Sequence, residues 1–477
     1  MTQHTVRMME RLGLPTLRKA ADWSAYAAVI FLALGAQQAW AKVSPEEAEK
    51  LKNGTLTPSG AEPGANADGT ITAWEGGITT PPPGYPGAPE ARYPNIFPND
   101  KPKFVITTQN LDQYKDKLTP GQLALFAKFP DTYKMPVYET KRTFANNDWV
   151  YEWNYKNALN AVVTNEGNGF EGAAVGIPFP IPKDGFEPIW NHKARFRGQS
   201  VRRWNNQAAV TTSGNFNLAT LQEDVQFWYN MKERTPDTVN NLLLSFMQIR
   251  HAPSRLRGEV LLVHETLDQV SEERRAWLYN PGQRRVRRAP NVGHDNPGTG
   301  ADGLRTNDQT DMFNGSLERY TWKLVGKKEI YIPNNSYDIH QDKYKYEDLV
   351  NPGHMNQDPA RYELHRVWVV DSNLKEGTSH IYGRRVYYIS EDAWQMAVVD
   401  VYDKRGELWR VQEAHTIQAA DPKSGIVATA PILEAIYDLQ ATRYLLQAMN
   451  NEHEESHEVP FDEKYFTTGN MKQLAPK

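Results

Sequence analysis

Two groups of residues have the types and spacing that could bind a metal ion. His453 and His457 lie four residues apart near the C-terminus, where a helix would present both imidazoles on one side to zinc. Four carboxylates that could hold calcium lie among glycines in residues 294–314: Asp295, Asp302, Asp308 and Asp311. The histidines belong to an acidic tail, and the aspartates lack the ordered spacing of an EF-hand. We therefore predict no metal site and no cofactor.

Residues that could carry out covalent catalysis lack their usual sequence context. The chain contains no cysteine, which excludes disulfides, thiolate catalysis and thiolate metal sites. No serine occurs in a Gly-x-Ser-x-Gly elbow, and GNGFEG at 167–172 does not have the form of a phosphate-binding loop. A carboxylate pair for glycoside hydrolysis can be distant in sequence, and no pattern singles one out. We predict that the protein is not an enzyme, with an exported hydrolase as the alternative.

The charge of the chain disfavours a nucleic-acid partner. Its formal net charge is −4 at pH 7, whereas binding to nucleic acid needs a basic surface. Aromatic residues make up 11% of the chain and supply much of the area that folding can bury. Without disulfides, the stability of an exported protein rests on that packing.

Residues 1–41 have the three parts of a cleavable secretory signal. The positive region contains Arg7, Arg11, Arg18 and Lys19. An apolar run follows from Trp23 to Ala36, and Ala39-Trp40-Ala41 supplies the small residues of a cleavage site. The run is about 14 residues, shorter than the roughly 20 that cross a bilayer as a helix. We predict cleavage before Lys42 and a periplasmic location in a Gram-negative bacterium; an uncleaved membrane anchor is the alternative.

Composition divides the mature chain into three segments. Residues 42–103 are rich in Pro and Gly, which excludes long helices and central strands, and their spaced aromatics favour an extended segment wrapping the body over a plain linker. Residues 104–450 are predicted to form one β-rich domain with a helical lid. Residues 451–477 read as an acidic tail.

Helix signals are confined to the first part of the domain. Thr119-Pro120-Gly121-Gln122 combines a cap, a first-turn proline and a capping-box glutamine, and it predicts a helix ending near Phe129. A second helix is predicted over residues 146–162. Residues 167–188 are rich in Gly and Pro and are predicted to be a long ordered loop of the kind that lines binding sites or closes over them.

From about residue 195 the pattern becomes that of antiparallel strands. The predicted strands are 255–266, 275–279, 284–288, 320–332, 361–371, 384–390, 394–402 and 407–415. Short turns such as Asn280-Pro281-Gly282-Gln283 and Asp403-Lys404-Arg405-Gly406 join neighbouring strands as hairpins. Residues 431–450 fit either a helix or a final strand.

Aromatic side chains in these strands fall on one parity, so each set shares a face of its sheet. Trp277 and Tyr279 form one such set, and Trp394 with Met396 and Val398 forms another. An aromatic concave face could enclose a ligand cavity; alternatively, the aromatics fill a core. The predicted ligand-binding residues are Trp277, Tyr279, Trp322, Trp368, Trp394 and Trp409, with Phe179 and Trp190 in the lid.

Several long strings resemble one proteobacterial family of unassigned function. They are LTPSGAEPGANADGTITAWEGG from residue 56, GIPFPIPKDGFEPIWNHKARFRG at 176–198, AWLYNPGQRRVRRAPNVGHDNP at 276–297, ERYTWKLVGKKEIYIP at 318–333 and YDLQATRY at 437–444. The chain is identified as a member of domain-of-unknown-function family 1329, whose proteins are often described as outer-membrane lipoprotein-sorting-like. The family is distantly similar to Lol-type periplasmic lipoprotein carriers.

The resemblance implies an α+β fold: a large curved antiparallel sheet, an incomplete barrel like that of lipoprotein carriers, covered by helices and Pro/Gly-rich loops. It implies a periplasmic carrier or chaperone for a lipid, a lipidated protein or another apolar molecule, serving an exporter of the resistance-nodulation-division class or an outer-membrane protein. Basic side chains at Arg284, Arg285, Arg287 and Arg288 parallel the basic surface of such carriers, although an exposed strand edge kept soluble by charge is the favoured explanation. A structural subunit of a cell-envelope assembly remains a further alternative.

Overall fold

The computed structural model describes residues 43–87, 92–289, 294–453, 456–457, 459–462 and 464–476. The predicted signal at residues 1–41 lies outside these ranges. Within them, no helix combines the length and the apolar content that a membrane span requires.

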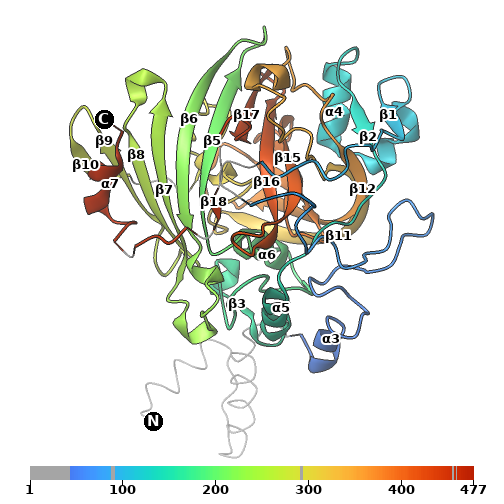
Figure 1. Ribbon diagram of the computed structural model, residues 1–477, viewed down its shortest axis with the longest axis horizontal. Coiled ribbons are helices and arrows are strands. Elements are labelled where there is room, and N and C mark those ends of the chain that lie inside the picture. Colours follow the sequence, from blue (N-terminus) through green and yellow to red (C-terminus); the bar gives the residue numbers. More distant parts are fainter. Residues whose placement is uncertain are drawn as a thin grey trace, which may run out of the picture. The chain divides into compact units, whose positions relative to one another are not determined.

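Sixteen strands of the described residues join in one large sheet, which makes the protein an α+β fold (Figure 1). The strand order is β1-β2-β12-β13-β14-β15-β16-β17-β5-β6-β7-β8-β9-β10, with β11 paired to β12 and β18 to β5. Neighbours are antiparallel except at the short β2–β12 contact. The two ends of this order do not pair with each other, so the curved sheet is an incomplete barrel, as predicted.

The sheet has two arms. The first arm contains β5 Ser200–Val210, β6 Phe216–Gln226, β7 Leu242–Ala252, β8 Val260–Thr266, β9 Arg275–Asn280 and β10 Arg285–Arg288. The second arm contains β11 Tyr320–Pro333, β12 Tyr362–Leu374, β13 Arg384–Ser390, β14 Met396–Tyr402, β15 Leu408–Ala420, β16 Val427–Asp438 and β17 Arg443–Met449. The remaining strands are β1 Phe104–Ile106, β2 Met135–Val137, β18 Ser456–His457 and the separate pair β3 Val162–Thr164 and β4 Gly169–Glu171.

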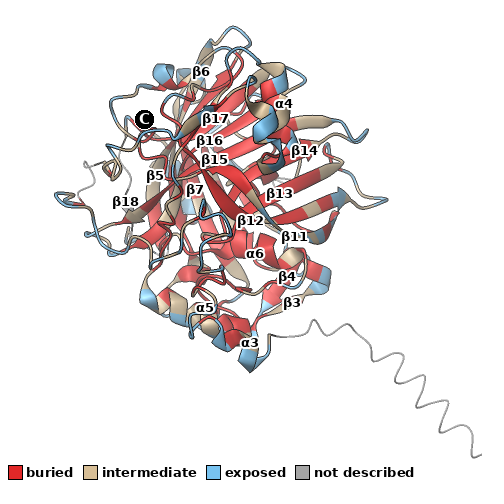
Figure 2. Cartoon of the chain, turned by 90° about the vertical axis from the view of Figure 1, so that its right-hand side faces the viewer, coloured by how far each residue is buried: buried red, intermediate tan, exposed pale blue. Residues whose placement is uncertain are grey.

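Helices cover both faces of this sheet: α4 Pro120–Lys128, α5 Asp148–Asn160, α6 Phe186–Ala194 and α7 Thr468–Leu474. A further helix, α3 Pro45–Glu49, packs against α5. Strand alternation sends Val398 and Val411 into the core beneath α4, whereas Val399 and Val401 belong to the core around α6. We call the α6 side the inner face and the α4 side the outer face. Both faces of the middle strands of the second arm are therefore buried, as Figure 2 shows for β13, β14 and β15, whereas β11 alternates between buried and exposed residues.

The predicted start of α4 is confirmed. Thr119 Oγ1 accepts the Gln122 N–H at 3.1 Å, and the Gln122 side chain accepts the Thr119 N–H at 3.1 Å, which closes the capping box. The helix ends at Lys128, one residue short of the prediction. The second predicted helix is also present, as α5.

Three local predictions need correction, and one open alternative is resolved. Residues 167–188 are not one loop, because they contain β4 and the start of α6, where Asp184 accepts the N–H groups of Phe186 and Glu187. The strand predicted from residue 255 begins at Val260. Trp394 precedes β14 in a turn with a φ of 55°, outside any strand. Residues 431–450 form strands, because Pro431 lies at a bulge in the β15–β16 pairing, where proline is tolerated.

The described parts of the Pro/Gly-rich segment before β1 contact the body at several points. Ser59 O accepts from Trp394 Nε1 at 2.8 Å, and Trp74 Nε1 donates to Phe144 O at 2.8 Å. Gly60 has a φ of 89°, and a Cβ at that position would lie 1.8 Å from the Pro180 carbonyl oxygen. Only glycine permits this approach.

Candidate functional site

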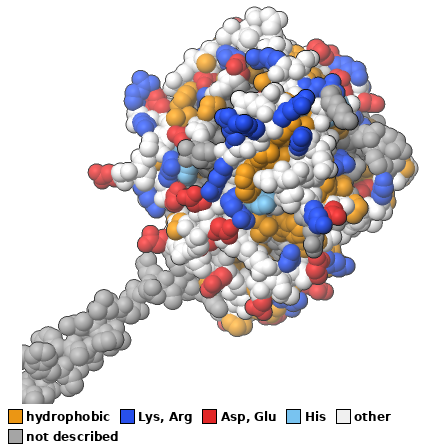
Figure 3. All heavy atoms as spheres, turned by 90° about the vertical axis from the view of Figure 1, so that its left-hand side faces the viewer, with side chains coloured by type: hydrophobic (Ala, Val, Ile, Leu, Met, Phe, Trp, Pro, Cys, Tyr) orange, Lys and Arg blue, Asp and Glu red, His pale blue; other side chains and the backbone are white. Residues whose placement is uncertain are grey.

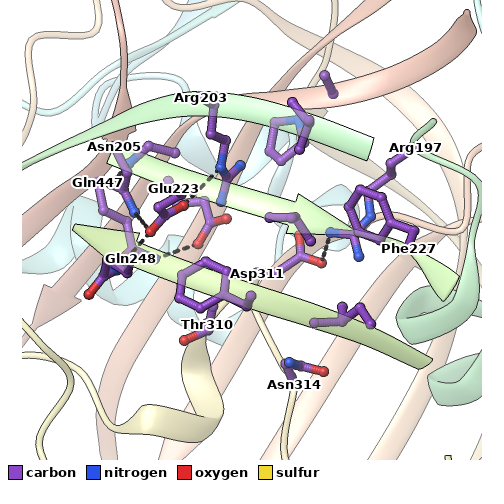
Figure 4. A pocket seen from close by; sticks show the side chains of 18 of the residues that line it. Arg197, Arg203, Asn205, Glu223, Phe227, Gln248, Thr310, Asp311, Asn314 and Gln447 are labelled. Atoms are coloured by element: carbon purple, nitrogen blue, oxygen red, sulfur yellow. Dashed lines mark hydrogen bonds and ion pairs between the residues drawn. The ribbon is translucent and has the colours of Figure 1, made fainter. Parts of the chain in front are cut away.

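A cavity of about 160 Å³ lies against the inner face of the first arm (Figure 4). Its walls come from β5–β8, from β15–β17 and from residues 299–314, which cross between the arms. Residues that are distant in sequence thus line the same cavity, because the curved sheet brings β16 and β17 close to β5.

One wall of the cavity is apolar and is built by strand alternation. Its side chains are Val201, Val225, Phe227, Leu244, Phe246, Leu261 and Val263. The intervening residues, such as Met247 and Leu262, pack in a separate cluster with Met471 of α7 on the outer face. The facing wall consists largely of small side chains, Ala419, Ala428 and Ala430. Their size leaves room between the two walls.

A buried carboxylate organises one end of the cavity. Glu223 on β6 accepts hydrogen bonds from Arg203 Nε at 2.9 Å, Asn205 Nδ2 at 2.8 Å and Gln248 Nε2 at 2.8 Å. Figure 4 shows these four side chains converging from three adjacent strands. The network satisfies the carboxylate, as a buried charge requires.

A second carboxylate, Asp311, anchors the crossing segment. Its oxygens lie 2.7 Å from Arg195 Nη2 and 2.6 Å from Arg197 Nη1. Burial alone would raise the pKa of Asp311, but the two guanidinium groups outweigh it and hold this pKa well below its usual range. Asp311 adopts a φ of 51°, and its carbonyl oxygen lies 2.7 Å from His192 Nε2 of α6. The crossing segment is therefore tied to the core of the second arm.

Glu434 on β16 has a different environment from the other two acids. Its one hydrogen bond in the described structure comes from Gln447 Nε2 at 2.6 Å. Burial, followed by the negative charge of Asp311, raises the pKa of Glu434 to about 7, although Arg203 and Arg305 oppose the shift. This carboxyl group therefore keeps its proton to a higher pH than an exposed glutamate does.

The far end of the cavity holds Glu265 and Arg274 as a buried ion pair. Lys193 of α6 lies behind them, with its Nζ 3.9 Å from Glu265 Oε1 and 2.8 Å from the Gly315 carbonyl oxygen. Burial lowers the pKa of Lys193 to about 8, while Glu265 works in the opposite direction.

The eight side chains predicted to bind ligand lie elsewhere, and none of them lines this cavity. Trp277 and Tyr279 do share a face, but it is the outer face beneath α7. Four others are buried in the core around α6: Phe179, Trp190, Trp322 and Trp394. Trp368 stacks on Trp394 with ring centres 6.3 Å apart, and Trp409 Nε1 donates to Asp438 at 3.0 Å.

The groups considered for metal binding have other partners. Asp308 contacts His380 and Arg385, and Asp302 contacts Arg443. The ring of His453 stacks on Trp204 with a centroid distance of 4.5 Å, while the side chain of His457 lies outside the described part. No group of three or more potential ligands that could hold a metal occurs in the residues described.

The open sheet and the cavity between its arms define an α+β half-barrel protein. The chain belongs to the family described as "Protein of unknown function (DUF1329)", whose model matches residues 105–472, and this confirms the family resemblance. It is 50% identical over 449 residues to the uncharacterized protein PA3922 of Pseudomonas aeruginosa, covering 93% of this chain and 97% of that one.

Three solved structures are similar to parts of the chain. A putative outer membrane lipoprotein-sorting protein domain from Vibrio parahaemolyticus has a TM-score of 0.40 at 13% identity, covering 60% of this chain and 98% of that one. A DUF1329 family protein from Desulfovibrio piger has a TM-score of 0.38 at 13% identity, with 58% and 92% covered. The LolA superfamily protein NE2245 from Nitrosomonas europaea has a TM-score of 0.36 at 12% identity, with 60% and 99% covered.

Proposed function

We propose that this protein is a non-enzymatic periplasmic carrier or chaperone that holds a hydrophobic molecule in the cavity between the arms. The observation that supports the proposal is the apolar wall, to which four adjacent strands contribute seven large side chains. An engineered cavity of about 150 Å³ takes up benzene, so the space of about 160 Å³ suits an alkyl segment or an aryl ring. Burial of each methylene contributes about 0.8 kcal/mol.

The cavity also contains polar groups, whereas the pocket of a carrier is expected to be nearly all apolar. Their arrangement nevertheless favours a carrier over a hydrolase. Glu223 and Asp311 are each held by two or more donors, so they are engaged in the scaffold. The described residues that line the cavity include no serine and no histidine. The cavity wall described here therefore offers no hydroxyl nucleophile beside a histidine base.

Delivery of the ligand to an envelope transporter of the resistance-nodulation-division class, or to an outer-membrane protein, is part of the proposal. It rests on the family resemblance and on the export signal predicted at residues 1–41. The eight aromatic residues predicted earlier remain a second proposed ligand surface, secondary to the cavity.

Mass spectrometry of an organic extract of the purified native protein tests the proposal. Ala430 lines the cavity and is half-buried, so Ala430→Trp should fill the space without displacing core residues. Ala441→Trp, in the exposed β16–β17 turn, is the matched control. We expect a stoichiometric apolar compound from the wild type and the control but not from Ala430→Trp. Equal yields from all three proteins would contradict the cavity as the binding site.

A further inference from the structure

The cations at the polar end of the cavity differ in how closely an acid pairs with each of them. Arg203 is paired with Glu223. Asp311 is shared by two guanidinium groups, those of Arg195 and Arg197. Buried charges are stable when they are paired and costly when they are not. A cavity-lining cation without a close acid therefore points to a negative group that is supplied from elsewhere.

Arg305 is the cation with the weakest pairing. It is 5% exposed and lines the cavity. Its guanidinium donates to Thr310 Oγ1 at 2.9 Å and to two carbonyl oxygens, of Thr299 and Thr306, at 3.4 and 3.5 Å. In the residues that the structure describes, no carboxylate lies within 4.0 Å of it, and its Nε has no hydrogen-bond partner.

Comparison with Arg385 shows that the lack of a carboxylate is specific to Arg305. Arg385 is as deeply buried, but its Nη2 lies 2.6 Å from Asp308 Oδ2. Burial lowers the pKa of Arg305, and the attraction of the more distant Glu434 and Glu223 does not offset this. The pKa of Arg385 is instead raised, because Asp308 outweighs the effect of its burial.

The chain makes room for the Arg305 guanidinium at one glycine. A Cβ on Gly298 would lie 2.7 Å from Arg305 Cζ, so any larger residue would displace the charged group from its place. Glu434 is the acid that could repel an anion beside Arg305. Because burial raises the pKa of Glu434 to about 7, this repulsion is weakened by protonation near neutral pH.

We infer that the carried molecule has an anionic head group, and that Arg305 binds this group while the chain lies along the apolar wall. Carboxylate, phosphate and sulfate all match the planar donor fork of a guanidinium. The ligand class is thus an anionic amphiphile, either a free acid or the head of a larger lipid. This inference rests on the proposed carrier function.

Four probes with the same chain and different heads test the inference: dodecanoate, dodecyl phosphate, dodecanol and dodecyltrimethylammonium, each below its micelle concentration. Titration calorimetry of the delipidated full-length protein gives their affinities. We expect both anions to bind about tenfold more tightly than dodecanol, as charge-assisted hydrogen bonds in a buried site predict. A preference between the carboxylate and the phosphate distinguishes a free acid from a phospholipid head.

Variants assign the preference to Arg305. Arg305→Gln should abolish the tenfold advantage and leave dodecanol affinity unchanged, while Arg305→Lys should keep part of it. Arg285→Gln, on the exposed strand β10, is the matched control and should behave as the wild type. If Arg305→Gln does not fold, Gly298→Ala displaces the guanidinium without removing its charge and should reduce the advantage.

The outcomes separate this inference from the proposed function. Binding of none of the four probes would refute the carrier cavity itself. Equal affinity for the anions and dodecanol in the wild type, or tighter binding of the cation, would refute the anionic head group alone. A retained advantage in both Arg305→Gln and Gly298→Ala would show that another group binds the head.

Discussion

Replacement of Trp190 by alanine tests whether α6 belongs to the core or acts as a lid over a ligand. The indole is fully buried. Its Nε1 donates to the Gly167 carbonyl oxygen at 2.9 Å, and its ring meets Phe170 edge-on at 5.2 Å. Lys193 Nζ lies 4.5 Å from the ring centre. All these contacts are internal, so we expect the substitution to act on stability.

The expected cost follows from the buried area. A tryptophan buries roughly 200 Å², which at about 25 cal/mol per Å² corresponds to about 5 kcal/mol. Measured Trp→Ala substitutions in cores cost about 3–5 kcal/mol. The Gly167 carbonyl would also lose its donor inside the core, which adds about 1 kcal/mol. We expect a loss of at least about 4 kcal/mol in the free energy of unfolding.

Urea denaturation followed by far-UV circular dichroism measures this loss. Trp204→Ala is the control, because Trp204 is half-buried on β5 and its ring contacts among the described residues are with His251 and His453; its cost should stay below about 2 kcal/mol. If Trp190→Ala kept its stability within about 1 kcal/mol and instead lost affinity for dodecanoate, α6 would be a lid and the reasoning would fail.

Two further predictions concern buried acids and the N-terminal segment. Burial raises the pKa of both Asp400 and Glu413 to about 7; their stabilising contribution is complete below about pH 4 and is lost as the pH rises through 7. The free energy of unfolding, measured from urea curves, should therefore decrease from pH 5 to pH 8, by up to about 1.4 kcal/mol per pH unit for each group. Glu413→Gln should flatten this slope. Gly60→Ala should release the N-terminal segment from Pro180 and speed its digestion in limited proteolysis; Gly84→Ala, also at positive φ but with no atom near its Cβ, should not.

Local signals explain which parts of the fold could be predicted. The start of α4 needs only Thr119, Pro120 and Gln122, which are adjacent in sequence and close the cap among themselves. The hairpins of the second arm are similarly marked by short turns between alternating strands. The open curvature followed from the family resemblance, since no local pattern specifies how far a sheet bends.

The faces of the strands could not be assigned from sequence. Trp277 and Tyr279 do lie on one side of β9, as their two-residue spacing predicts, but parity alone does not distinguish inside from outside. In this protein α7 covers the outer face and turns it into a second apolar interface. Arg203 and Glu223 were missed for a related reason: charged residues in a strand are normally on its solvated side. The one signal that could have identified these two residues was their direct cross-strand pairing.

The half-filled inner face explains why one part of the sheet can hold a ligand and the other cannot. On the second arm, α6 and the aromatic residues after the crossing segment fill the concavity. On the first arm, the hydrogen bonds of Glu223 join β5, β6 and β7 within one wall, and those of Asp311 tie the crossing segment to Arg195 and Arg197. The gap between the two apolar walls forgoes packing contacts that a filled core would make, and this costs stability. Ala430→Trp should recover part of that cost and raise the thermal midpoint while it prevents binding, since a binding cavity is maintained at the expense of stability. A variant that lost both stability and ligand would instead show that the space cannot accommodate an apolar group.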